Sequence, residues 1–304
     1  MATVRSSYDN KNFIDRLAGW LTWSRFFFLL TLFFFLGSIV FPFYWMVSSS
    51  FKSQAEIAAR APVYVPAELR PDAYLELFDP SHPSYQNFAV NIMNSVLVSI
   101  PASLITVILA VLGAYAIARL KFRGKSLMLN GVLVVYLFPG VLLIIPLFAM
   151  LAQMGDRLGV DIQDSLGVLT VTYLAQTLPV ALYMLTNYFR TIPHEIEQAG
   201  LIDGCSRFEV IWRITMPLAV PALISVGVYS FMIAWNEFLY AFVFLNQNEL
   251  FTIPIKINTL ANDPSPRPHV VMAASTIMTL PIIVLFLSLE RFLAEGLSAG
   301  GVKG

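Results

Sequence analysis

Long apolar stretches separated by short polar segments set the pattern of this sequence. Each stretch, as a helix rising about 1.5 Å per residue, is long enough to cross a hydrocarbon core of about 30 Å. The pattern therefore predicts an all-α membrane protein with six transmembrane helices in one domain over residues 26–289. The six stretches are approximately Phe26–Val47, Asn91–Ala118, Leu127–Leu151, Leu166–Phe189, Leu218–Leu245 and Val270–Leu289.

The composition supports a membrane protein and excludes several other classes. Of the 304 residues, 57% are hydrophobic and 12% are charged, whereas soluble domains carry about 25% charged residues. The net charge of zero indicates no nucleic-acid partner. The single cysteine, Cys205, cannot form an internal disulfide. No catalytic arrangement is recognisable, so we expect no enzyme, no metal and no cofactor bound by this chain itself.

The distribution of Lys and Arg predicts the orientation in the membrane. Thirteen of the 19 lie on the side that carries the two termini, and basic residues favour the cytoplasm. We therefore expect cytoplasmic segments at 1–25 and 290–304. The segments at about 48–90, 152–165 and 246–269 would then lie outside. The first and third are Pro-rich, and each forms either a cap with short helices, a docking surface for an external partner, or a plain connector.

A few polar residues interrupt the apolar stretches. Gln176, Tyr183 and Asn187 share one helical face with Thr172. This face either lines a substrate path or forms hydrogen bonds with a neighbouring helix. Glu237 is an acid inside the fifth stretch, where insertion costs about 2.5–3.5 kcal/mol at the bilayer centre. We expect its side chain to point inward, either into the substrate path or as a structural hydrogen-bond anchor.

The second stretch carries small residues at helical spacing. Such a stripe allows two helix backbones to approach closely. It therefore predicts a tightly packed helix interface. The stripe consists of Ser95, Ser99, Ser103, Thr106, Ala110 and Gly113.

The segment between the fourth and fifth stretches, residues 190–217, is longer than a connector needs to be. Pro193 and the acids that follow it are typical of a helix start, which predicts a helix over about 193–203. The Asp203–Gly204 pair breaks this helix, a second helix of mixed polarity follows, and Pro217 leads into the next stretch. We expect Leu201, Phe208 and Trp212 to be exposed for docking to a partner protein.

This segment resembles the EAA signature of the permease subunits of bacterial ABC importers. That signature runs Glu-Ala-Ala, three residues, Gly, nine residues, Ile-x-Leu-Pro. Its Gly, Ile and Pro correspond to Gly204, Ile214 and Pro217 with the spacing intact. The sequence departs from it in having Gln198 for the Glu, Gly200 for the second Ala and Met216 for the Leu. Glu197, one residue earlier, offers an alternative acid.

Two further segments are similar to carbohydrate-uptake permeases, and most to the second permease of maltose-type importers. These are Trp235-Asn236-Glu237-Phe238 and the tail Gly296–Gly304. The resemblance covers about residues 26–304 and implies a type I ABC importer permease fold in the bacterial inner membrane. It implies that the chain forms half of a sugar path, with Gln176, Tyr183, Asn187 and Glu237 as candidate lining residues.

The resemblance also implies partners. These are a homologous but distinct permease, two ATPase subunits that bind ATP and Mg²⁺, and an extracytoplasmic substrate-binding protein. A secondary transporter or a channel is the alternative, although no internal repeat is visible. The residues that the resemblance assigns to ATPase coupling are Glu197, Gln198, Ala199, Gly200, Leu201, Asp203, Gly204, Phe208, Ile214 and Pro217.

Overall fold

The computed structural model describes residues 23–79, 81, 85–137, 139–159 and 162–301. Most of the predicted N-terminal segment 1–25 and the last three residues of the predicted tail lie outside these ranges. The described part is helical, with the π-helical segment η1 among α-helices. The helices are α2 (Trp23–Ser50), α3 (Gln54–Ile57), α4 (Asp72–Leu77), α5 (Phe88–Arg119), α6 (Lys125–Leu137), α7 (Gly140–Leu158), α8 (Leu166–Thr191), α9 (His194–Ile202), α10 (Arg207–Val210), η1 (Ile211–Thr215), α11 (Met216–Leu218), α12 (Val220–Asn236), α13 (Leu239–Phe244), α14 (Ile253–Ala261) and α15 (Pro268–Gly301).

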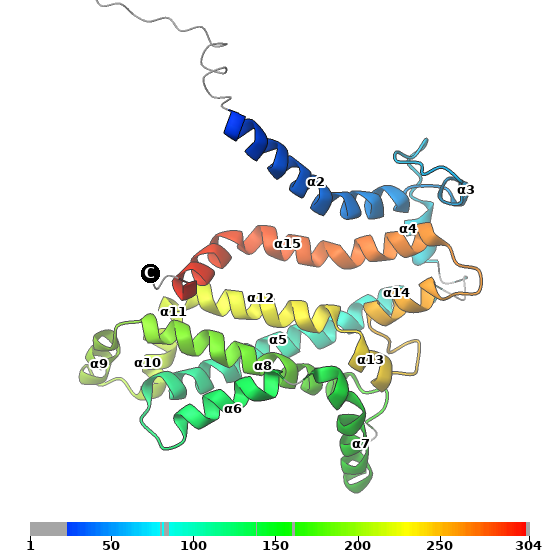
Figure 1. Cartoon of the computed structure of the whole chain (residues 1–304). Helices are drawn as coiled ribbons and strands as arrows, with labels where there is room; N and C mark the ends of the chain where they lie inside the picture. The colour runs from blue at the N-terminus through cyan, green and yellow to red at the C-terminus, as the bar shows by residue number, and fades with distance from the viewer. Residues whose placement is uncertain (1–22, 80, 82–84, 138, 160–161, 302–304) are drawn as a thin grey trace, which may run out of the picture.

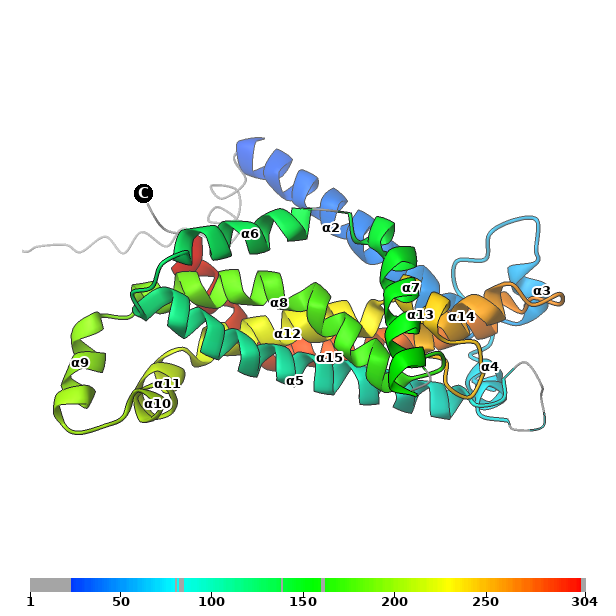
Figure 2. The ribbon, with the colours of Figure 1, turned by 90° about the horizontal axis from the view of Figure 1, so that it is seen from below.

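Four long helices form the body of the molecule. Helix α5 packs against α8 and α12, and α12 packs in turn against α15. Figures 1 and 2 show these helices running lengthwise beside one another, with α9 and α10 at one end and α4 and α14 at the other. Helix α2 contacts α15, and α7 points away from the bundle across its length. The bundle thus has an α9 end and an α14 end, which serve as reference points below.

Most of the predicted spans are confirmed as single helices. Five described helices are long and apolar enough to cross a membrane, and a bent pair makes six if it is counted as one span. The bent pair joins Arg207–Leu218 to Val220–Asn236 at 84°. The first, second, fourth and sixth predicted stretches correspond to α2, α5, α8 and α15. Helix α15 continues through the predicted tail as far as Gly301.

The third and fifth predicted stretches are wrong as continuous helices. The third is divided into α6 and α7, and Pro139 caps the start of α7 with a φ of −59°. Proline fixes φ near this value and has no N–H to continue a preceding helix. The fifth is divided into α12 and α13 at Glu237, whose backbone is extended with φ −68° and ψ 129°. Hydropathy alone does not reveal such breaks because both halves are apolar.

The stripe of small residues on α5 packs tightly, as predicted. Ser99, Thr106 and Ala110 are fully buried. The Ser103 hydroxyl donates to the Gly227 carbonyl of α12 at 2.7 Å. The hydroxyls of Thr106 and Thr177 lie 2.8 Å apart and join α5 to α8. Small side chains therefore allow close approach and also cross-link the three central helices.

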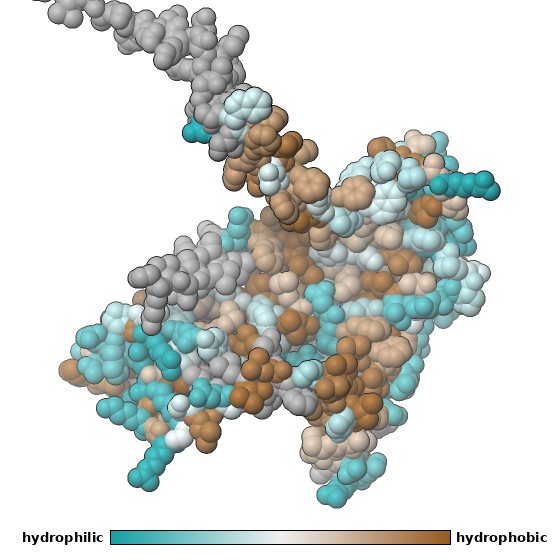
Figure 3. Space-filling model, viewed as in Figure 1, coloured by the Kyte–Doolittle hydropathy of each residue, from teal (hydrophilic) through white to brown (hydrophobic). Residues whose placement is uncertain are grey.

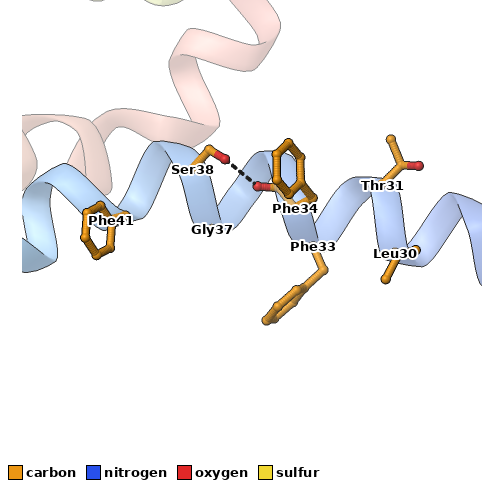
Figure 4. A pocket seen from close by; sticks show the side chains of 7 residues that line it. All are labelled: Leu30, Thr31, Phe33, Phe34, Gly37, Ser38 and Phe41. Atoms are coloured by element: carbon orange, nitrogen blue, oxygen red, sulfur yellow. Dashed lines mark hydrogen bonds between the residues drawn. The ribbon is translucent and has the colours of Figure 1, made fainter. Parts of the chain in front are cut away.

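Two helices expose apolar surface instead of burying it. In the most apolar part of α2 no residue is buried. The buried share of the corresponding part is 11% in α7 and 44% in α8. Figure 3 shows hydrophobic side chains covering both projecting helices. A hollow of about 830 Å³ lies beside α2. Figure 4 shows that its seven lining side chains, including Phe33 and Phe41, all come from α2 itself. This hollow is open space beside one helix and not an internal binding pocket.

Candidate functional site

The segment with the signature-like sequence forms a hairpin of short helices at the α9 end. Helix α9 begins after Pro193 and ends before Asp203, which matches the predicted helix over 193–203. Helix α10 begins at Arg207 and continues directly into η1. Figure 2 shows this hairpin projecting beyond the ends of α5 and α8. Its position leaves the hairpin free to contact another protein.

The turn between the two arms has a defined geometry. Gly204 adopts a φ of 92°, which is strained for residues with a side chain. The Gly204 amide donates to the Leu201 carbonyl at 3.2 Å, and the Cys205 amide donates to the Gly200 carbonyl at 3.0 Å. These two bonds form a Schellman motif, in which glycine is the usual residue at the left-handed position. Gly204 therefore fixes the direction in which the chain leaves α9.

Glu197 holds the hairpin to the bundle. Its side chain is 1% exposed and forms an ion pair with Arg119, at the end of α5, with an Nε–Oε1 distance of 3.0 Å. The Thr215 hydroxyl donates to the same oxygen at 3.1 Å. Arg119 also donates through Nη2 to the Ile192 carbonyl at 2.8 Å. The Glu197 carboxylate is thus an internal contact of the hairpin and is not offered to an external partner.

The two arms of the hairpin also pack together. A Cβ atom on Gly200 would overlap the Ile214 side chain, so Ile214 occupies the space that a larger residue at position 200 would need. The second arm starts with a capping box, in which Ser206 and Glu209 bond each other's backbone amides. The π-helical turn η1 follows, and such turns are rare and often occur at functional sites.

The outer face of the hairpin carries large apolar side chains. Ile202 is 85% exposed, Phe208 is 60% exposed and Trp212 is 43% exposed. The rings of Phe208 and Trp212 lie 5.9 Å apart. Leu201, which we expected on this face, is half-buried, and Ile202 takes its place. Exposed apolar residues on a braced hairpin, two of them aromatic rings in contact, are typical of a docking surface.

A cavity of about 670 Å³ opens among α7, α8, α12 and α13. Its polar lining includes the amide of Gln176 and the carboxylate of Glu237. Tyr183 and Asn187 do not line it. They lie farther along the same face of α8, about 10 Å and 16 Å from Gln176 toward the α9 end. The structure therefore brings together two of the four candidate path residues and places the other two beyond the cavity.

Glu237 serves as a hydrogen-bond anchor at the break between α12 and α13. Its carboxylate accepts hydrogen bonds from the Tyr173 hydroxyl at 2.8 Å, the Tyr240 amide at 2.9 Å and the Ala241 amide at 3.1 Å. The two amides belong to the first turn of α13, where free N–H groups favour an anion. Of the two alternatives left open by the sequence, these bonds match the structural anchor, while the carboxylate also lines the cavity.

Sequence reasoning missed the partners of both acids. In the sequence pattern Arg119 is only one of the thirteen basic residues on the side of the termini, and neither Tyr173 nor Thr215 stands out. Tyr173 lies three residues before Gln176, so helical spacing could have placed it near the polar face of α8. Nothing in the linear spacing could have paired Arg119 with Glu197, because the pair is 78 residues apart.

Comparison with known proteins identifies the family. Residues 105–298 match the family described as "Binding-protein-dependent transport system inner membrane component". The chain is 40% identical over 283 residues to the inner membrane ABC transporter permease protein YcjP of Escherichia coli, covering 93% of this chain and 98% of that protein. It is 32% identical to the trehalose/maltose transport system permease protein MalG of Thermococcus litoralis, covering 87% and 92%. The resemblance to carbohydrate importer permeases is thereby confirmed.

Other relatives and a solved structure agree. The sulfoquinovosyl glycerol transport system permease protein SmoH of Agrobacterium fabrum is 30% identical, covering 87% of this chain and 89% of that protein. The crystal structure of a bacterial ABC transporter involved in the import of alginate contains a chain that matches with a TM-score of 0.74 at 19% identity, covering 93% and 98%. The predicted fold class is confirmed, and the chain belongs to the binding-protein-dependent transport system inner membrane components, the permeases of ABC importers.

Proposed function

We propose that this chain is the transmembrane subunit of an ATP-driven importer and forms half of the path for a sugar or oligosaccharide. Membership of the permease family supports the transport role. The names of SmoH and MalG, which denote transport of a sugar glycerol and of trehalose and maltose, support the class of substrate. The chain itself carries out no catalysis and binds no cofactor. ATP and Mg²⁺ bind to partner ATPase subunits.

The observation that carries the coupling role is the braced hairpin with its exposed apolar face. The residues named from the signature fall into two groups by burial. Those that shape the hairpin are buried or half-buried, namely Glu197, Gly200, Leu201 and Ile214. Those that contact an ATPase subunit are exposed, namely Gln198, Ala199, Asp203, Phe208 and Pro217, whereas Gly204 is exposed and shapes the turn through its backbone. With Gln198 in place of the signature acid, this contact depends on apolar surface more than on an ion pair.

The orientation follows from this role and from the distribution of charge. The α9 end faces the cytoplasm, where the ATPase subunits bind, and both termini lie on that side. The α14 end then faces outward and meets the substrate-binding protein. The described residues of segments 48–90 and 246–269 belong to this end, as the positions of α3, α4 and α14 in Figure 1 indicate.

The second permease and the lipid cover the apolar surfaces of α2 and α7. Both helices project from the bundle with their apolar side chains exposed. A helix that is apolar on all sides is stable in a membrane or against another apolar protein surface. A homologous but distinct permease packs against α7, the helix that projects across the bundle. The exposed apolar surface of α7 is too large for a helix that merely connects two spans.

The cavity next to Glu237 is our candidate for this chain's share of the substrate path. Gln176 and Glu237 line it, and Tyr183 and Asn187 continue the polar face of α8 toward the cytoplasmic end. Hydroxyl-rich sugars are recognised by a few placed polar groups within an otherwise apolar lining. Transport that is unchanged in both Asn187→Ala and Glu237→Ala would contradict this assignment.

A pull-down from detergent-solubilised native membranes tests the proposal. We expect a second permease and an ATPase subunit to co-purify with the intact chain. Phe208→Asp should lose the ATPase and keep the second permease. The matched control Tyr64→Asp, which changes an equally exposed aromatic residue at the α14 end, should keep the ATPase. Recovery of the chain alone, or as a homo-oligomer, would favour a secondary transporter or a channel.

A further inference from the structure

Helix α5 connects the two ends of the molecule in one piece. It runs from Phe88 to Arg119, and its 32 residues correspond to about 48 Å. Helix α8 ends at Thr191 and α12 is interrupted at Glu237. Figure 2 shows α5 extending from the base of the α9 hairpin to the neighbourhood of α14. The helix is therefore placed to transmit a displacement between the ends.

At the α9 end, α5 is fastened to the hairpin through charged groups. The Arg119 guanidinium bonds the Glu197 carboxylate of α9 and the Ile192 carbonyl that precedes α9. The side chains of this ion pair are 7% and 1% exposed. Thr215 of η1 bonds the same carboxylate. Both arms of the hairpin thus meet at the carboxylate that the last residue of α5 binds, and water has little access to loosen the contact.

At the α14 end, α5 is fastened to the loop that precedes α14. Asn91 donates through Nδ2 to the Asn248 and Phe251 carbonyls at 2.8 and 3.0 Å. Asn94 donates to the Glu249 and Phe251 carbonyls at 2.8 and 3.1 Å. In addition, the Ile253 amide donates to the Ser95 hydroxyl at 2.8 Å.

These bonds hold the segment 248–253 by its backbone. Its course relative to α5 is therefore set by three side chains within two adjacent turns of that helix. Side-chain amides that satisfy backbone carbonyls in a loop replace the bonds which regular secondary structure would provide.

Between its ends, α5 is tied to the helices that line the cavity. Ser103 bonds the Gly227 carbonyl of α12, and Thr106 bonds Thr177 of α8. A shift of α5 along or about its axis would therefore act on α8 and α12 as well. A contiguous set of packed and hydrogen-bonded elements can carry coupling between distant sites. Helix α5 with its two fastened loops is such a set.

We propose that α5 acts as one continuous helix that couples the ATPase-contacting hairpin to the outer loop 245–253. Asn91 and Asn94 are positioning residues at the outer end, and Arg119 and Glu197 are positioning residues at the inner end. The inference rests on the proposed function, because it requires that the hairpin contacts an ATPase. It adds that nucleotide binding below the membrane changes the outer loop through these four side chains.

A spin label on the outer loop tests the link without knowledge of the sugar. Gln247→Cys in a Cys205→Ser background places one nitroxide label on an exposed loop residue. The assembled importer, purified with its ATPase subunits, is measured without nucleotide and after trapping with Mg-ATP and vanadate. We expect the label spectrum of the otherwise unchanged chain to shift on trapping. A label at Glu195→Cys on the exposed side of α9 reports the inner end.

Removing the contacts at either end of α5 should abolish the response of the label at position 247. We expect Asn91→Ala/Asn94→Ala to reduce the fraction of label at position 247 that responds by about fivefold or more, while position 195 still responds. Arg119→Gln/Glu197→Gln removes both charges together, so that no unpaired charge stays buried, and should have the same effect at position 247. Ser99→Ala is the matched control, because the Ser99 hydroxyl bonds its own helix.

The outcomes separate the link from the proposed function. A response at position 247 that persists in both double variants overturns the link, as does an unchanged chain in which position 247 never responds. Failure of the ATPase to co-purify, or no response at position 195, overturns the proposed function and the link with it. A variant with all four substitutions should lose no more of the response at position 247 than the more damaging double variant. One break is enough to interrupt a connection whose parts act in series. Additive losses would overturn the series arrangement.

Discussion

Glu197 and Glu237 are carboxylates in two different regions of the molecule, and the protein satisfies them by different means. Glu197 is buried at the α9 end and is paired with the cation Arg119. Glu237 lies half-buried beside the cavity and accepts hydrogen bonds from a tyrosine hydroxyl and two backbone amides. Among the described residues, no Lys or Arg forms an ion pair with Glu237. One acid is therefore neutralised by charge, and the other is solvated by dipoles.

This difference assigns the two acids different tasks. An ion pair in a buried site is costly to break, because the remaining charge is left without a partner. The Glu197–Arg119 pair is therefore suited to a contact between the hairpin and the bundle that must keep its geometry. Glu237 is held by hydrogen-bond donors, with no paired cation in the part of the chain that the structure describes, and its carboxylate also lines the cavity. The substitutions below are ordered from the largest expected effect to the smallest, and each tests one side of this comparison.

Removal of the cation should have the largest effect. Arg119→Met leaves the Glu197 carboxylate buried and unpaired, and we expect a loss of about 3–5 kcal/mol in the free energy of unfolding. Arg119→Met/Glu197→Met should recover most of this loss, because neither charge remains. Unfolding of the detergent-solubilised protein by denaturant measures both. Arg123→Met, at an exposed position nearby, is the control, and an equal loss there would refute the role of the pair.

Removal of the dipole-bound acid should cost less. Glu237→Ala leaves the fully buried Tyr173 without its hydrogen-bond acceptor, and we expect a loss of about 1–3 kcal/mol. Glu237→Gln keeps an acceptor oxygen and should lose less than Glu237→Ala. The cycle with Tyr173→Phe measures the bond itself, and a coupling energy near zero would show that the hydroxyl does not depend on the carboxylate.

Substitution of Gly204, in the turn after α9, should act through backbone conformation alone. A Cβ atom on Gly204 would meet no other atom within 4 Å, so the cost of Gly204→Val comes from its φ of 92°. We expect about 1–2 kcal/mol of local strain, which redirects the hairpin and detaches or uncouples the ATPase subunits. Gly204→Asn, which tolerates the left-handed conformation better, should keep more of the coupling. Normal co-purification and transport in Gly204→Val would be evidence against this reading.

The sequence predicted the hairpin better than it predicted the cavity. The helix over 193–203 and the break at Gly204 follow from local rules of capping and turn formation, and the structure reproduces them. The membrane spans follow from hydropathy where helices are continuous. These features depend on residues that are close together in the chain, so a linear pattern contains the information they need.

The cavity depends on contacts that a linear pattern does not contain. The break at Glu237 arises because its side chain caps α13, and an apolar stretch with one acid gives no sign of this. Tyr183 and Asn187 share a helical face with Gln176, yet the cavity ends before them because α7 crosses the bundle near Gln176. The position of α7 in turn follows from the interruption at Pro139. Periodicity identified the correct face, and tertiary packing decided how much of it lines the cavity.

Lys256 extends the comparison to a buried base and should give the smallest effect. Its ammonium donates to the Gln86 carbonyl at 2.8 Å and the Asn248 side chain at 3.0 Å, and burial lowers its pKa from 10.5 to about 8. Between these values the unfolded chain binds the proton that the folded chain has released, so stability rises with pH. We expect the thermal midpoint to rise by about 2–4 °C more in the unchanged protein than in Lys256→Met between pH 7.5 and 9.5. Equal pH dependence in both proteins would show that neutral acceptors compensate fully for the burial of this charge.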